Sequence, residues 1–160
     1  MKILACVSVS LMVCGSVFAG EATASTEPKT TAEADSSPSM YEAGSFVKNK
    51  LKQGGLTNVR FDNTGKELKF TVPGTNQSGR IFLNLCDPER VEVSSTSDGK
   101  SDGRPSVTIF GSNDEDIFSS IGSEGRNRYQ FVVASKEDAE RVGKAFRHLI
   151  KLCGGKKSAF

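Results

Sequence analysis

SKEDAERVGKAFRHLIKLCGG, residues 135–155, is the stretch that decides the fold. Ser135 is a good helix N-cap, and Glu137 and Asp138 follow it in the first turn, where the helix dipole favours negative charge. Apolar residues then recur at alternating spacings of three and four, which predicts an amphipathic helix with one buried face. The predicted core face consists of Ala139, Val142, Phe146, Leu149 and Ile150, and it continues to Cys153.

Gly143 lies inside this predicted buried face. A glycine in a helix costs about 1 kcal/mol relative to alanine, so we expect a packing reason for it. Without a side chain at this position, the helix backbone can approach a sheet closely. Gly154 and Gly155 predict the end of the helix. The sequence therefore predicts a long C-terminal helix packed on a sheet.

The first residues have the pattern of a signal peptide. An apolar run, residues 3–18, follows Lys2, and Val17-Phe18-Ala19 is typical of a cleavage site. We expect residues 1–19 to be removed near Ala19 and the protein to be exported, to the periplasm or outside the cell. The run is shorter than the roughly 20 residues of a spanning helix, so we expect no membrane span. A lipid anchor on Cys14 is the alternative, but the residue before it is bulky where a small one is usual.

A polar segment follows at residues 20–39, with no apolar residue larger than alanine. Such a segment cannot bury enough surface to offset the entropy of ordering, so we expect a disordered tether. A single domain at residues 40–156 and a short tail at residues 157–160 complete the expected organisation. The formal net charge is +2, and no clustered basic face is apparent, so we expect no nucleic-acid partner.

The expected domain begins with a helix at Met40 that ends at Gly54-Gly55. From Leu56 the apolar period changes from helix to strand, with a hairpin turn at Asn63-Thr64-Gly65. We expect five or six short antiparallel strands, which centre on residues 59–61, 68–72, 80–85, 91–93, 107–110 and 129–133. The acidic stretch Asp114-Glu115-Asp116 is expected to be a loop or the first turn of a short helix. The predicted class is α+β: a bent antiparallel sheet or partly open barrel with both helices packed on it.

Two cysteines, Cys86 and Cys153, remain after the expected cleavage. An oxidising destination favours a disulfide between them. The bond would close a loop of roughly seventy residues and stabilise the fold by about 4 kcal/mol on the chain-entropy model. Two buried free thiols are the alternative. No Cys-x-x-Cys pair indicates a catalytic role for either residue.

No residue pattern selects a catalytic, cofactor or metal site. His148, the only histidine, is expected to face solvent opposite the core face, and one histidine with two distant cysteines does not make a tetrahedral zinc set. The segment from Asp98 to Gly103 begins like a calcium loop, but Lys100 and Ile109 occupy positions where oxygen ligands belong. Glycine-rich phosphate loops, nucleophile elbows and His-Glu-x-x-His are missing from the sequence. We therefore expect no cofactor and no enzymatic activity.

The second half of the chain resembles a group of exported bacterial proteins. The resemblance rests on Phe131-Val-Val-Ala-Ser and on Ala-Phe-Arg-His-Leu-Ile-Lys-Leu-Cys-Gly-Gly at residues 145–155. These proteins are similar in outline to pleckstrin-homology-like (PH-like) domains, and the resemblance covers residues 79–156. It implies a bent antiparallel sheet closed at one end by a C-terminal helix. It does not imply binding of phosphoinositide headgroups, because the turn between the first strands holds a single lysine, Lys66.

These observations favour an exported, non-enzymatic module that binds another exported or envelope protein. A periplasmic inhibitor or immunity-type protein is one specific form of this hypothesis. A small secreted hydrolase, with carboxylates that the sequence does not select, is one alternative. A carrier of an apolar ligand between sheet and helix is the other.

The assigned helix face makes a first prediction. Leu149→Ala should lower the free energy of unfolding by about 2–4 kcal/mol, because the substitution leaves a cavity beneath the helix. His148→Ala should change it by about 0.5 kcal/mol or less, as for a residue outside the core. Chemical denaturation of both variants tests the assignment. The reverse ranking would mean that the helix presents a different face to the core.

Overall fold

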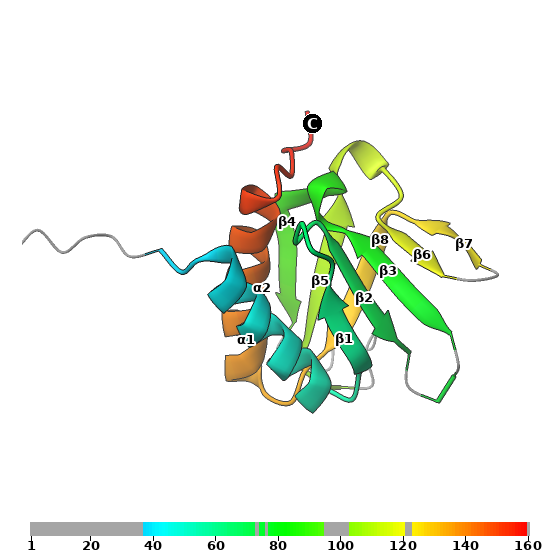
Figure 1. Ribbon diagram of the computed structural model, residues 1–160, viewed down its shortest axis with the longest axis vertical. Coiled ribbons are helices and arrows are strands. Elements are labelled where there is room, and N and C mark those ends of the chain that lie inside the picture. The colour runs from blue at the N-terminus through cyan, green and yellow to red at the C-terminus, as the bar shows by residue number, and fades with distance from the viewer. Residues whose placement is uncertain (1–36, 73, 76, 95–102, 121–122, 160) are drawn as a thin grey trace, which may run out of the picture. The chain divides into compact units, whose positions relative to one another are not determined.

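The computed structural model describes residues 37–159 apart from positions 73, 76, 95–102 and 121–122. The expected signal peptide, most of the expected tether and the segment from Asp98 to Asp102 lie outside the described residues. The described chain has two helices, α1 (Met40–Gln53) and α2 (Lys136–Leu152), and two antiparallel sheets (Figure 1). The predicted α+β class is confirmed.

One sheet has five strands in the order β1-β2-β3-β6-β7, and the other has three in the order β4-β5-β8. The strands are β1 (Thr57–Phe61), β2 (Glu67–Thr71), β3 (Ser78–Phe82), β4 (Cys86–Ser94), β5 (Ser106–Gly111), β6 (Phe118–Ser120), β7 (Ser123–Arg126) and β8 (Arg128–Val132). In the described part of the chain these sheets do not close into a barrel. The structure thus has two sheets and more strands than the five or six that we predicted.

The differences from the predicted strands have local causes. The predicted strand at residues 80–85 stops at Phe82, because Leu83–Leu85 form a 3-10 turn and Cys86 already begins β4. The acidic stretch was expected to be a loop or the first turn of a short helix. It is a 3-10 turn at Ser112–Asp114 that continues as a loop, and the residues after it form a strand, β6. Asn113 and Asp114 have φ values of 50° and 59°, a left-handed conformation that no α-helix contains. The chain therefore turns sharply here and returns as the β6–β7 hairpin.

Helix α1 begins with a reciprocal cap. The Glu42 backbone N–H donates to Ser39 Oγ over 3.3 Å, and the Ser39 backbone N–H donates to Glu42 Oε2 over 2.8 Å. This capping box satisfies two donors that a helix start leaves without partners. Residues 37–39, which we assigned to the tether, thus belong to the ordered start of the domain.

Helix α2 follows the prediction closely. Ser135 is its N-cap and accepts a hydrogen bond from the Asp138 backbone N–H over 3.1 Å. All members of the predicted core face are buried: Ala139, Val142, Phe146, Leu149, Ile150 and Cys153. A Cβ atom on Gly143 would lie only 2.6 Å from Val93 Cγ2, so the glycine allows the helix to approach β4. The expected packing reason is confirmed.

Aromatic rings connect the two sheets to α2. The ring centroid of Phe131 on β8 lies 5.7 Å from that of Phe70 on β2 and 5.2 Å from that of Phe146 on α2. Phe118 and Tyr129 extend the cluster across β6 and β8. Contacts of this kind stabilise beyond the area that they bury, which makes the cluster the centre of the core.

The helices are antiparallel and lie side by side on one side of the sheets (Figure 1). Near the end of α1, Lys50 Nζ lies 2.8 Å from Asp138 Oδ1 in the first turn of α2. At the other end, His148 Nε2 lies 2.6 Å from the Pro38 carbonyl oxygen. Neither described helix is both long enough and apolar enough to cross a membrane.

The close approach at Gly143 generates a second prediction. Gly143→Ala should lower the free energy of unfolding by about 1 kcal/mol, although alanine is the better helix former. The overpacking cost of roughly 1–3 kcal/mol exceeds the propensity gain of roughly 0.5–1 kcal/mol. Denaturant unfolding of the variant measures the net effect.

Val93→Ala supplies the matched background for this test. With the Val93 methyl groups removed, the same Gly143→Ala substitution should be neutral or stabilising, because only the propensity gain remains. An equal loss of stability in both backgrounds would show that the contact with β4 does not explain the glycine.

Candidate functional site

Helix α1 lies between two surface hollows. The first, here called the inter-helix groove, has a volume of about 700 Å³ and lies between α1 and α2. The second, here called the hairpin hollow, has a volume of about 460 Å³ and lies between α1 and the β1–β2 turn. Both volumes fall in the range of roughly 300–1,000 Å³ that is common for ligand sites.

The inter-helix groove combines an apolar floor with cations. Its floor consists of Ala43, Phe46 and Ala145. Three basic or titratable side chains of α2 line its other side: Arg141, Lys144 and His148. Their spacings of three and four place them on one face of the helix. The Arg141 guanidinium lies 5.0 Å from the centroid of the Phe46 ring, a cation–π contact between the helices.

His148 is half-buried in this groove, which corrects the prediction that it faces solvent. The first residues before α1 cover it, with the Pro38 carbonyl oxygen 2.6 Å from its Nε2. Glu42 is the acid of the groove, but the capping box engages its carboxylate. The backbone N–H of Ser39, and then its hydroxyl, hold the pKa of Glu42 below its ordinary value. These bonds keep the Glu42 carboxylate ionised, so the groove combines one acid with two cations, Arg141 and Lys144.

The hairpin hollow has a different composition. Met40, Phe61 and Leu149 form apolar walls, and Lys48 and Arg60 stand at the polar side. Tyr41 also lines the hollow, and 82% of its surface is exposed.

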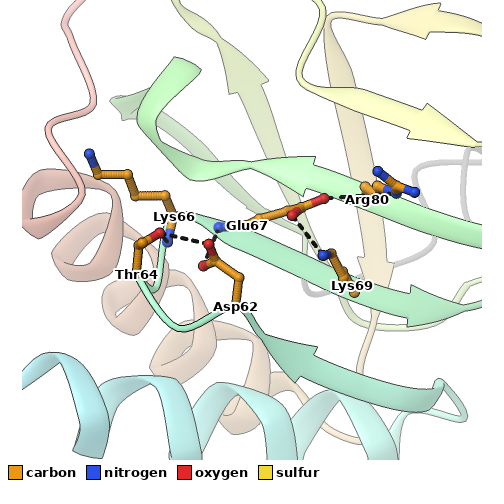
Figure 2. A network of polar contacts seen from close by, with 6 residues as sticks. All are labelled: Asp62, Thr64, Lys66, Glu67, Lys69 and Arg80. Atoms are coloured by element: carbon orange, nitrogen blue, oxygen red, sulfur yellow. Dashed lines mark hydrogen bonds and ion pairs between the residues drawn. The ribbon is translucent and has the colours of Figure 1, made fainter.

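The turn that borders this hollow is held by Asp62. Thr64 Oγ1 donates to Asp62 Oδ2 over 2.7 Å, and the Glu67 backbone N–H donates to Asp62 Oδ1 over 3.0 Å (Figure 2). Burial opposes ionisation of Asp62, but the hydrogen bonds from Thr64 and Glu67 outweigh it and lower its pKa. Gly65 completes the predicted turn with φ of 72°. Asp62 thus stabilises the turn as a charged hydrogen-bond acceptor.

Glu67 is likewise engaged on the outer face of the five-stranded sheet. Its carboxylate lies between Lys69, with Nζ at 2.9 Å, and Arg80, with Nε at 3.8 Å (Figure 2). The register places Arg60, Lys69 and Arg80 directly opposite one another on adjacent strands. Like charges in such positions are destabilising, so Glu67 compensates two of the three cations.

The two cysteines are free and buried, so the predicted Cys86–Cys153 disulfide is not formed in the structure. Each thiol has its own acceptor. Cys86 Sγ donates to the Phe82 carbonyl oxygen and Cys153 Sγ to the Gly65 carbonyl oxygen, both over 3.3 Å. Burial, and to a smaller extent Cys153, raise the pKa of Cys86 from its ordinary 9.0 to about 12. Such a thiol is a poor nucleophile at neutral pH.

The C-terminal tail is bound to the domain by a buried aspartate. Asp87 accepts hydrogen bonds from the backbone N–H groups of Glu89 over 2.8 Å and Ser158 over 2.9 Å. Burial opposes its ionisation, but the bonds from Ser158 and Glu89 lower its pKa. The Ala159 backbone N–H adds a bond to Asn113 Oδ1 over 3.1 Å. Asp87 is therefore a structural acid.

Neither hollow was predicted from the sequence. The helix from Met40 was predicted only to pack on the sheet, and Arg141, Lys144 and Arg60 were not singled out. The signal available was the basic stripe on α2 opposite its core face, which is also typical of a solvated surface. Only the position of the neighbouring helix α1 distinguishes a groove-lining stripe from an ordinary solvated surface.

Within the described ranges, no group of three or more His, Cys, Asp or Glu residues is arranged to hold a metal ion. Comparison with protein-family models, curated proteins and solved structures gives no match for the chain. The site is therefore interpreted from its own geometry.

The buried thiol generates a third prediction. Because the pKa of Cys86 is higher in the folded protein, its contribution to stability is full below the unfolded-state pKa of 9.0 and is lost toward pH 12. From about pH 9 to about pH 11, wild type should lose about 2 kcal/mol more than Cys86→Ala. Urea unfolding in reducing buffer at several pH values measures this difference.

Cys153→Ala is the control, because its thiol is less buried and most of the alkaline loss should persist in that variant. Parallel pH profiles for wild type and Cys86→Ala would contradict the raised pKa.

Proposed function

We propose that the protein is an exported, non-enzymatic interaction module that binds a segment of another exported or envelope protein in the inter-helix groove. The observation that carries the proposal is the arrangement of Arg141 over Phe46. A guanidinium that lies over an aromatic ring is partly ordered before a partner binds, which lowers the entropic cost of its hydrogen bonds. Arginine and aromatic residues are also enriched among the residues that dominate binding energy in protein interfaces.

The charge of the groove defines the partner segment. Arg141 and Lys144 line the groove with two cationic side chains, and the single carboxylate of Glu42 balances only one of them. An acidic segment is complementary to this surface and would be steered toward it. The apolar floor at Phe46 and Ala145 suits one apolar side chain of the same segment. We therefore infer a partner segment with acidic residues next to an apolar anchor.

The state of the acids and thiols supports a non-enzymatic function. Three acids have structural roles: Asp62 stabilises a turn, Glu67 forms ion pairs and Asp87 binds the C-terminal tail. Cys86 is protonated at neutral pH, and His148 faces a carbonyl oxygen. A small hydrolase is the less supported alternative, because these groups have structural partners in place of a nucleophile or a base.

A periplasmic inhibitor or immunity-type protein remains the specific form of interaction module that we propose. Export rests on the signal-peptide pattern at residues 1–19 and is part of the same proposal. The relation to PH-like domains is also part of the proposal. It is supported by the antiparallel sheets with a C-terminal helix packed on them. The other alternative, a carrier of an apolar ligand, would use a different site, the hairpin hollow.

A comparison of captured proteins tests the proposal and is the fourth prediction. Tagged wild type and the double variant Arg141→Glu/Lys144→Glu are each used to capture proteins from the envelope fraction of the producing cell. Quantitative mass spectrometry should find a partner whose capture falls by about ten-fold or more, as when a central arginine of an interface is lost. Its capture should also weaken with salt.

Lys136→Glu/Lys151→Glu is the matched control, because it makes the same charge change on exposed positions of α2 outside the groove. This control should capture the partner as wild type does. Equal losses in both double variants would indicate non-specific charge effects. Equal capture by all three proteins would exclude the groove as the binding surface.

A further inference from the structure

The hairpin hollow has the parts of a small-molecule site, on the opposite side of α1 from the inter-helix groove. Its apolar lining comes from Met40 of α1, Phe61 of β1 and Leu149 of α2. Gly44 also lines the hollow, and a Cβ atom there would make an ordinary van der Waals contact with Phe61, at 3.5 Å. Tyr41 stands at the rim with most of its ring in solvent. A ligand in the hollow would cover this ring.

Two cations, Arg60 and Lys48, form the polar side of the hollow. Glu67 pairs with Lys69 and Arg80, but in the described part of the chain Arg60 and Lys48 have no ion-pair partner. Arg60 also lies opposite Lys69 in the register of β1 and β2. A bound anion at Arg60 would relieve the repulsion between these two side chains.

Asp62 limits the charge of that anion. It lines the hollow, and its carboxylate stays ionised because Thr64 and the backbone of Glu67 donate to it. A head group with several negative charges would be repelled by Asp62 at the same rim. A single charge can be placed on the Arg60 and Lys48 side instead.

We propose that the hairpin hollow binds an amphipathic monoanion, an apolar body with one carboxylate or sulfonate head group. The body packs against Met40, Phe61 and Leu149, and the head group bonds to Arg60 and Lys48. A hollow of about 460 Å³ is of ordinary size for such a ligand. This site goes beyond the proposed protein-binding function and does not depend on it.

The fifth prediction uses 1-anilinonaphthalene-8-sulfonate, an aromatic monoanion, as the probe. Its fluorescence should rise on binding to the full domain, and dodecanoate should displace it. Dodecan-1-ol, which has the same apolar chain without the charge, should displace it about ten-fold less well, because a charge-assisted hydrogen bond is lost. NMR shift changes on titration with dodecanoate should centre on the amides of Gly44, Ser45, Asn63 and Gly65.

Charge variants locate the head group. Arg60→Gln and Lys48→Gln should each weaken probe binding by about ten-fold, since each removes a charged donor. Lys52→Gln is the matched control, one turn further along α1 and outside the hollow. The groove variant Arg141→Glu/Lys144→Glu should bind the probe as wild type does, which separates this site from the protein-binding surface.

Several outcomes would overturn the site. Absence of probe binding would contradict the site. Equal weakening by Lys52→Gln and Arg60→Gln would contradict the assignment of the head group to Arg60 and Lys48. Equal displacement by dodecanoate and dodecan-1-ol would remove the anionic head group. Shift changes centred on the inter-helix groove would place the ligand on the wrong side of α1.

Discussion

The contact between α2 and the three-stranded sheet is the constraint on which the rest of the structure depends. Gly143 lets the helix backbone approach Val93, and at this distance Phe146 can stack on Phe131. Phe131 in turn contacts Phe70 of the other sheet. Because closely packed interiors have few voids in which side chains can adjust, the position of one element fixes the positions of the elements packed on it. One helix thereby sets the separation of both sheets.

The position of α1 follows from that of α2, and both candidate sites follow from α1. The Lys50–Asp138 ion pair and the contact between His148 and Pro38 hold the two ends of the antiparallel pair. With the helices held side by side, their solvent-facing sides form the inter-helix groove. The opposite side of α1 faces the β1–β2 turn and forms the hairpin hollow. A single helix thus separates the groove that we propose for a peptide from the hollow that we propose for a small anion.

The charged residues fall into two groups: acids that stabilise the fold, and cations that line the two hollows. Asp62, Glu67 and Asp87 are acceptors for a turn, two cations and the tail, and their surroundings keep them in these roles. The cations of the two hollows have no such carboxylate partners in the described part of the chain. The ligands that we propose, an acidic segment and a monoanion, match these cations, although the net charge of +2 does not indicate such ligands. Local arrangement decides this property because exposed charges act mainly within about 10 Å.

The sequence by itself determined what depends on residues close together in the chain. The cap at Ser135, the core face of α2 and the turn at Gly65 are local, because each needs only neighbours within a few residues. Only the tertiary structure decided the two sheets, the β6–β7 hairpin and the free state of Cys86 and Cys153. Strand pairing and thiol separation depend on contacts distant in sequence, whose geometry no local pattern encodes. The candidate sites belong to this second group, because each hollow is formed by segments that meet only when the chain folds.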